Sequence, residues 1–228
     1  CPDTASKCVI SLGSGYFEGG DLLSFRPIGT HTEIVIVGSG EDSTVIHQLL
    51  IEDSDSVTLR NLTIRNSLSI YNSTVSLYDV KTKDIQYTKS LITATESTIE
   101  AIQDDQNHAA NGDFCGLEFI FSKVNFITAD RCTNVYIKNS MIGSVTTEEA
   151  TVSVDNSQIN VIDVTAGEVS LINSSVSGML KASSSGFGAS VRIRNSVVID
   201  LNIGDTYAEC LYASSGFEEY QSDCSIVP

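Results

Sequence analysis

The residue types best suited to catalysis form an acidic group in the middle of the chain. Asp104 and Asp105 are adjacent, Asp113 follows, and Asp130 precedes Arg131. Glycoside-cleaving enzymes use two carboxyl groups about 5–10 Å apart as acid, base or nucleophile. These five residues are the candidate catalytic residues if the chain is an enzyme. The alternative is an acidic loop in contact with solvent.

Hard oxygen ligands for calcium occur at residues 52–55 and 104–113. Neither segment has the spacing of an EF-hand or the Gly-rich nonapeptide repeat of calcium-binding solenoids. The histidines, at positions 31, 47 and 108, are too scattered to suggest a metal-ligand spacing. We therefore predict no metal site and no cofactor.

Charge and hydropathy restrict the partners of the protein. Its 228 residues include 13 basic and 29 acidic ones, for a net charge of -16. Such a charge favours solubility and repels polyanions, which argues against nucleic-acid binding. No apolar run approaches the roughly 18 residues that span a bilayer, so membrane insertion is not expected. Because the sequence starts at Cys1 without a Met or a signal-peptide core, we expect a mature or trimmed product.

The sequence motif Val-x-x-x-Asn-Ser occurs four times between residues 134 and 201. Its asparagines, Asn139, Asn156, Asn173 and Asn195, are 17, 17 and 22 residues apart, a spacing typical of a solenoid. We take this asparagine as the reference residue of its turn. Apolar residues lie four and two positions before each reference residue, and three and about six after it. The alternation of apolar and other residues before the asparagine predicts a strand with one buried face. After the asparagine the apolar residues shift from even to odd distances, which predicts that the chain turns a corner there. We expect the asparagines to adopt left-handed backbone there and to form an amide ladder; exposed turn residues are the alternative.

Four earlier turns follow the same rule with Asn61, Asp79, Glu96 and Lys123 at the reference position. Around Lys123 the inward residues are then Phe119, Phe121, Phe126 and Ala129. If Glu96 and Lys123 point inward, they must pair, because an unpaired buried charge is costly.

Extra residues within 103–113 and 183–188 are expected to form surface loops. We predict one domain, with caps at 1–30 and 205–228 around a helix at 31–204.

The repeat, together with the segments IVGSG (36–40) and VTLRNLTIRN (57–66), resembles the right-handed parallel β-helix proteins of the pectin-lyase-like superfamily. The resemblance implies an all-β, right-handed parallel β-helix of about 8–10 short turns. A left-handed helix is the alternative, but its hexapeptide repeat is not visible. The superfamily includes polysaccharide lyases, glycoside hydrolases, pectin esterases, phage tailspikes and non-catalytic adhesins.

Only fragments of a catalytic motif accompany this resemblance. Gln103, Asp104 and Asp105 look like part of the polygalacturonase acid motif, and Arg192 and Arg194 are similar to its basic motif. The two fragments lie about four turns apart, roughly 20 Å at the strand spacing, which is too far for a glycosidase. We therefore predict a non-catalytic module, with a small polysaccharide lyase or glycoside hydrolase as the alternative.

Six cysteines without a C-x-x-C pair favour disulfides in an oxidising compartment over a zinc site, with buried free thiols as the alternative. Six cysteines allow fifteen pairings. Their positions favour three local bridges, which would tie the terminal caps: Cys1–Cys8, Cys115–Cys132 and Cys210–Cys224. We expect a secreted or extracellular protein, or one on a cell or virion surface.

Glycosylation sequons occur at Asn61, Asn72 and Asn173. Asn61 and Asn173 are reference residues, so we expect them to be poorly accessible. Asn72 is the predicted glycan site.

Outward positions one and three before the reference residue carry basic and aromatic side chains on one sheet. The candidate ligand-binding residues are Arg60, Tyr78, Tyr136, Lys138, Arg192 and Arg194. Such a face suits an anionic glycan or an acidic protein; a polar face in contact with solvent is the alternative. An exposed apolar strip with Ile120 and Ile172 would instead indicate a homotrimer. The predicted function is adhesion, receptor or glycan binding, or a structural role.

Overall fold

The computed structural model describes residues 7–17, 23–25, 33–104, 115–130, 134–183, 189–203 and 207–211. The chain forms two compact units, Cys1–Cys115 and Gly116–Pro228. Every regular element of the described residues is a β-strand. Nowhere in this part of the chain is there a helix long and apolar enough to cross a membrane.

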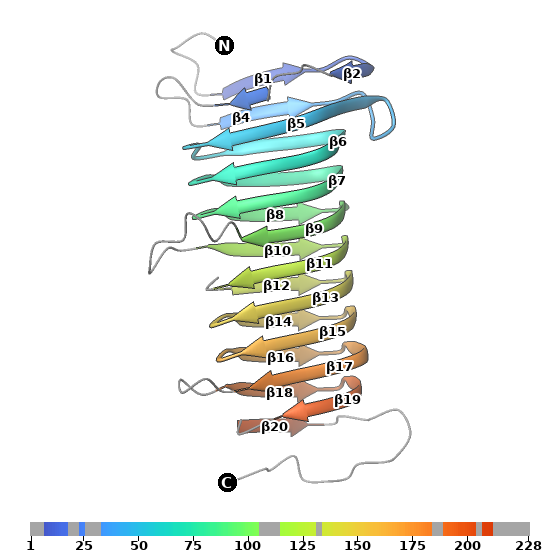
Figure 1. Cartoon of the computed structure of the whole chain (residues 1–228). Helices are drawn as coiled ribbons and strands as arrows, with labels where there is room; N and C mark the ends of the chain where they lie inside the picture. The colour runs from blue at the N-terminus through green and yellow to red at the C-terminus, as the bar shows by residue number, and fades with distance from the viewer. Residues whose placement is uncertain are drawn as a thin grey trace. The chain divides into compact units, whose positions relative to one another are not determined.

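The first unit is built from parallel strands that stack turn upon turn (Figure 1). One layer contains β1, β4, the first halves of β6 and β7, and β8; the other contains β5, the second halves of β6 and β7, and β9. Short strands β2 and β3 pair with β5. The strands are β1 (Lys7–Ser11), β2 (Gly15–Phe17), β3 (Leu23–Phe25), β4 (Glu33–Val37), β5 (Thr44–Glu52), β6 (Val57–Tyr71), β7 (Thr74–Thr88), β8 (Leu91–Thr95) and β9 (Thr98–Asp104).

The second unit repeats this arrangement with one strand of each layer per turn. Even-numbered strands β10 to β20 pair with one another in parallel, and so do odd-numbered strands β11 to β19. The strands are β10 (Gly116–Ile120), β11 (Lys123–Asp130), β12 (Asn134–Lys138), β13 (Met141–Glu148), β14 (Thr151–Asp155), β15 (Gln158–Thr165), β16 (Glu168–Ile172), β17 (Ser175–Ser183), β18 (Ser190–Arg194), β19 (Val197–Ile203) and β20 (Tyr207–Leu211).

Both units are parallel β-solenoids, and the repeat of about eight turns is consistent with the right-handed parallel β-helix fold. The predicted all-β class and the resemblance to these folds are thus confirmed. Strands also occur within the segments predicted as caps, since β1 pairs with β4 and β20 pairs with β18. The exact limits of the caps stay a prediction.

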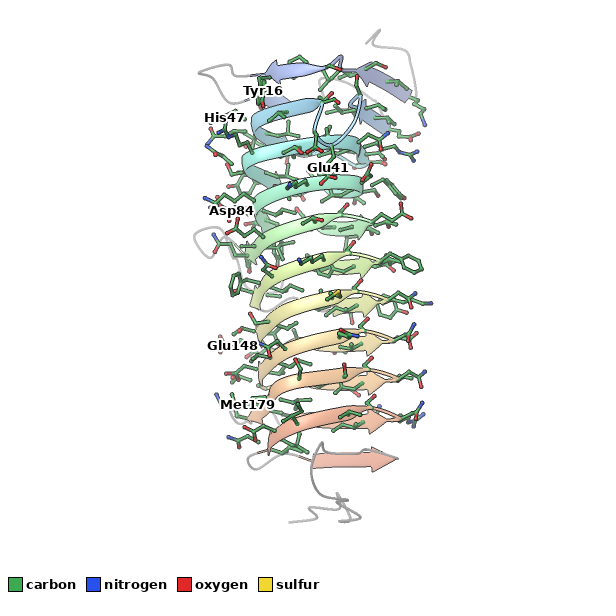
Figure 2. The ribbon with its side chains drawn as sticks, turned by 90° about the vertical axis from the view of Figure 1, so that its right-hand side faces the viewer. Tyr16, Glu41, His47, Asp84, Glu148 and Met179 are labelled. Atoms are coloured by element: carbon green, nitrogen blue, oxygen red, sulfur yellow. The ribbon has the colours of Figure 1, made fainter. Side chains whose placement is uncertain are left out.

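Apolar side chains of each turn point inward and stack on the equivalent residues of the next turn. In the second unit, for example, Val135, Val152, Val169 and Val191 follow one another in register and are all buried. A parallel strand has a period of two, so the intervening residues face outward. His47 and Asp84 extend in this way from one edge of the first unit (Figure 2).

The described turns have a first corner, and several also a second corner, at which a residue adopts left-handed backbone. The first corners hold the reference residues and the second corners follow the second strand of the turn. The described residues with φ near +50° at first corners are Asn61, Asp79, Glu96, Phe121, Asn139, Asn156, Asn173 and Asn195, and at second corners Asp53, Asn72, Lys89, Glu149 and Ala166. The expected left-handed corner is confirmed, whereas the second corner was not predicted.

Buried serines directly after the corner residues form a ladder that the sequence did not reveal. The Oγ of Ser157 accepts a hydrogen bond from the backbone N–H of Ser140 at 3.1 Å and donates one to the carbonyl of Asp155 at 2.7 Å. Ser122, Ser140, Ser157, Ser174 and Ser196 continue the same pattern from turn to turn. Ser140, Ser157, Ser174 and Ser196 each thereby give a partner to a backbone N–H at the corner of the neighbouring turn.

Hydrogen bonds between the side-chain amides of corner asparagines lie at the surface. Asn156 donates from Nδ2 to Oδ1 of Asn139, and Asn195 does the same to Asn173 at 2.6 Å, with both pairs exposed. The expected amide ladder therefore exists in part, at the surface and not in the core. Asn61 and Asn173 are exposed, so the prediction that they are poorly accessible is wrong.

The predicted register of one turn is wrong by two residues. Phe121, not Lys123, lies at the corner with φ +50°, and Leu117 and Phe119 are the buried residues before it. Phe121 and Phe126 are both exposed, contrary to the prediction that they point inward. Glu96 and Lys123 are both exposed, so neither charge needs a buried partner.

Of the cysteines, Cys8 and Cys115 have described side chains, and both are buried. Neither is a free thiol. Cys1, Cys132 and Cys224 lie outside the described residues, and only the backbone of Cys210 is described. The three predicted pairings therefore stay predictions.

Candidate binding site

Two of the six predicted ligand-binding residues lie in the first unit. Arg60 and Tyr78 are direct neighbours in the β6–β7 register, and the Arg60 guanidinium lies 4.7 Å from the centroid of the Tyr78 ring. A cation over an aromatic face is attracted by the ring quadrupole. The two side chains therefore stabilise each other, and they form a small patch with polar neighbours such as Ser76.

The other four residues lie at two separate places in the second unit. Tyr136 and Lys138 are on β12, whereas Arg192 and Arg194 are on β18, about 14 Å away across three strand spacings. Arg192 forms an ion pair of 2.9 Å with Glu168. The structure thus does not gather these residues into one basic surface.

Acidic residues further reduce the positive charge of this face. Lys138 is the register neighbour of Asp155, and the corrected register places Glu118 beside Tyr136. Ile120 and Ile172 are separated by Lys138 and Asp155 in the same row of register neighbours, so they form no continuous apolar strip.

Two of the five candidate catalytic residues, Asp104 and Asp130, lie in the described part of the chain. Asp104 is the last residue of β9, in the first unit, and Asp130 ends β11 in the second. Asp105, Asp113 and Arg131 lie outside the described residues. The enzymatic alternative therefore stays a prediction. Within the described residues there is also no group of three or more metal-ligating side chains.

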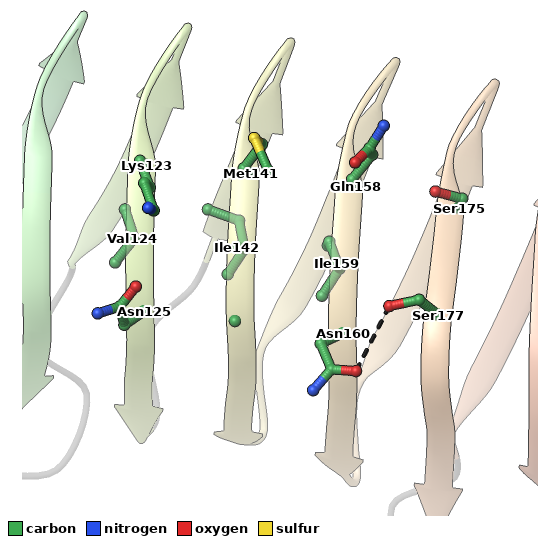
Figure 3. A pocket seen from close by; sticks show the side chains of 11 residues that line it. Lys123, Val124, Asn125, Met141, Ile142, Gln158, Ile159, Asn160, Ser175 and Ser177 are labelled. Atoms are coloured by element: carbon green, nitrogen blue, oxygen red, sulfur yellow. Dashed lines mark hydrogen bonds between the residues drawn. The ribbon is translucent and has the colours of Figure 1, made fainter.

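A groove that the sequence did not predict runs across β11, β13, β15 and β17 of the second unit (Figure 3). Its volume is about 260 Å³. The side chains two residues after each first corner form the first wall, and those four residues after it form the second wall. The residues between these two rows form the floor. The first wall contains Lys123, Met141, Gln158 and Ser175; the floor Val124, Ile142 and Ile159; the second wall Asn125, Gly143, Asn160 and Ser177.

Gly143 is the one residue of the second wall without a side chain. A Cβ atom at this position would overlap the carbonyl oxygen of Asn125 on the neighbouring strand. The second wall therefore has a gap between the amides of Asn125 and Asn160. Ser177 donates a hydrogen bond of 3.4 Å from its Oγ to Oδ1 of Asn160, which orients that amide along the wall (Figure 3).

The groove differs chemically from the rest of this acidic protein. Its described lining residues include no carboxylate, although the chain has a net charge of -16. Amides and hydroxyls of Asn125, Gln158, Asn160 and Ser175 supply both donors and acceptors above an apolar floor. Such a surface suits an elongated ligand that is rich in hydroxyl groups.

The groove was not predicted from the sequence because the two-residue register error misplaced the residues of β11 relative to the corner. Placing Phe121 at the corner moves Lys123 and Asn125 into the two wall positions. The available signal was Ser122, because a serine also follows each asparagine of the four regular copies.

Comparisons of the chain with protein-family models, with curated proteins and with solved structures each gave no match.

Proposed function

We propose that the protein is a non-catalytic β-helix module that binds an extracellular glycan chain in the groove across β11, β13, β15 and β17. The observation that carries the proposal is the groove itself, whose hydrogen-bonding walls have no carboxylate among the described lining residues of a strongly acidic protein. Secretion or display on a surface is part of this proposal.

The shape of the groove favours a polymer over a small molecule. Small-molecule sites bury most of the ligand in an enclosed cavity. This groove is instead shallow and spans four parallel strands, about 14 Å at the strand spacing. A chain that lies across the strands would meet equivalent side chains in every turn.

The chemistry of the walls favours a sugar chain. Hydroxyl groups both donate and accept hydrogen bonds, and so do the amides of Asn125, Gln158 and Asn160. The exposed side chain of Met141 would contact the C–H groups of the sugar rings. A densely anionic polymer is less well matched, because Lys123 is the single cationic residue among the described lining residues.

Binding to a glycan array tests the proposal with three variants. The groove variant Asn125→Ala/Gln158→Ala/Asn160→Ala should lose the binding of the wild-type protein. Ser153→Ala/Ser170→Ala, which removes polar groups from the outer face of β14 and β16, is the matched control and should bind normally.

The variant Arg192→Ala/Arg194→Ala tests whether the ligand binds in the groove or at the basic residues predicted from the sequence. Its binding should also be unchanged. Loss of binding in this variant, with retention in the groove variant, would place the ligand on the basic residues and overturn the proposal. Cleavage of a bound glycan, detected as new reducing ends or unsaturated sugars, would favour the enzymatic alternative.

We also propose that disulfides stabilise the ends of the protein in an oxidising compartment, as Cys1–Cys8, Cys115–Cys132 and Cys210–Cys224. The burial of Cys8 and Cys115, neither of which is a free thiol, supports this pairing scheme without selecting partners. Peptide mapping under non-reducing conditions should recover these three linked pairs. Any other pairing would refute the scheme.

A further inference from the structure

Phe121 occupies a position that is unfavourable for a large apolar residue. Its φ is +50°, and its side chain is 61% exposed. Left-handed backbone is tolerated by Asn and Asp but is rare for bulky residues. Among the described corners Phe121 is the one aromatic residue. Because most of the ring is exposed, burial of the side chain does not explain a phenylalanine at this corner.

Phe126 is a second exposed ring on the same turn. It is 57% exposed and directly follows Asn125, which is also exposed, at a bend of β11. The register neighbour of Phe126 on β13 is Ser144, a small polar residue. The fold therefore does not require a large apolar side chain at this position.

The two phenylalanines flank the groove residues of β11 along the chain. Phe121 is two residues before Lys123 of the first wall, and Phe126 is one residue after Asn125 of the second wall. Met141, the register neighbour of Lys123, adds an exposed apolar side chain to the first wall. Large apolar groups are thus concentrated where the groove crosses β11 and β13.

We propose that Phe121 and Phe126 are stacking contacts for pyranose rings of a neutral or weakly charged linear glycan at the β11 end of the groove. This inference rests on the proposed glycan-binding function. A pyranose ring has apolar C–H groups on its faces and hydroxyls on its edge. The phenylalanine rings would contact the faces, while the amides of Asn125 and Asn160 bind the edges.

Strain at Phe121 makes the inference testable, because a binding role and a structural role predict opposite effects on stability. Local strain of this kind persists where function requires it. The variant Phe121→Asn restores the residue of the regular corners. It should unfold at a higher temperature than the wild-type protein and yet bind the glycan about three- to ten-fold more weakly.

The second variant, Phe126→Ser, copies the residue at the neighbouring position of β13. It should weaken binding by a similar factor, about three- to ten-fold, without unfolding the protein. Ile172→Ser is the matched control, because Ile172 is an exposed apolar residue on the other layer of the same unit. Its Kd for the glycan should equal that of the wild-type protein.

Binding is measured by calorimetry with the best wild-type ligand from the array, and stability by thermal unfolding. If the groove variant loses binding while both phenylalanine variants keep the wild-type Kd, the stacking role is wrong and the glycan groove stands. If the wild-type protein binds no glycan on the array, both proposals fail. Sedimentation that shows a wild-type oligomer, converted to monomer by Phe121→Asn, would assign the rings to self-association and overturn the inference.

Discussion

Replacement of Ser157 by alanine tests whether the buried serines, and not the more conspicuous asparagines, hold the turns together. Ser157 Oγ accepts a hydrogen bond from the Ser140 N–H and donates one to the Asp155 carbonyl. Ser140 and Ser157 are both buried. Alanine would leave the Ser140 N–H without its partner and without access to water.

The two lost hydrogen bonds are not equally costly. A buried N–H without a partner costs about 1–3 kcal/mol. The Asp155 carbonyl keeps a hydrogen bond of 3.1 Å from the backbone N–H of Asn139, so its loss is about 0.5–1.5 kcal/mol. We therefore expect Ser157→Ala to lower the free energy of unfolding by about 2–4 kcal/mol, or Tm by about 4–16 °C.

Asn156→Gly is the matched variant one residue earlier. It removes the exposed amide contact with Asn139, while glycine readily adopts the φ of +48° at this corner. The expected change in unfolding free energy is within about 1 kcal/mol. Urea denaturation of the two variants and the wild-type protein gives the comparison. A greater loss for Asn156→Gly than for Ser157→Ala would refute the serine-ladder reasoning.

Three further predictions follow from the packing and the surface. Gly143→Ala should lower the free energy of unfolding by about 1–3 kcal/mol, because the new Cβ would overlap the Asn125 carbonyl; unchanged urea denaturation would contradict this. Leu171→Ala should cost about 2–5 kcal/mol, whereas Ile172→Ala, on the exposed side of the same strand, should cost less than about 1 kcal/mol; equal losses in thermal unfolding would argue against the inward–outward assignment. Expression in a glycosylating host should attach a glycan to Asn72, which is exposed at a second corner, and intact mass should fall on Asn72→Gln; an unchanged mass would exclude this site.

The repeat itself could be predicted from the sequence because its cause is local. Strand residues alternate between two faces with a period of two, so buried valines such as Val152 and Val169 mark the inner face directly. The position of the first corner was equally visible, since the parity of the apolar residues changes after Asn156 and Asn173. Their φ values of +48° and +49° confirm it.

The predicted basic face failed because neutralisation depends on neighbouring turns. Arg192 is exposed in the repeat as predicted, but its partner Glu168 comes from the preceding strand at a position that was not considered. An outward position specifies a direction for one side chain. It does not specify which charges stand next to it.

The sequence by itself determined the parallel β-helix, most of its inner face and all but one of the described first corners, because these follow from the spacing of residue types along one strand. Only the tertiary structure decided that Ser157 is buried, that Phe121 is a corner residue and that Gly143 lines a groove. Each of these features depends on residues about one turn apart that meet only when the turns stack. Stacking register is set by the packing of whole turns, which no single segment of the sequence encodes.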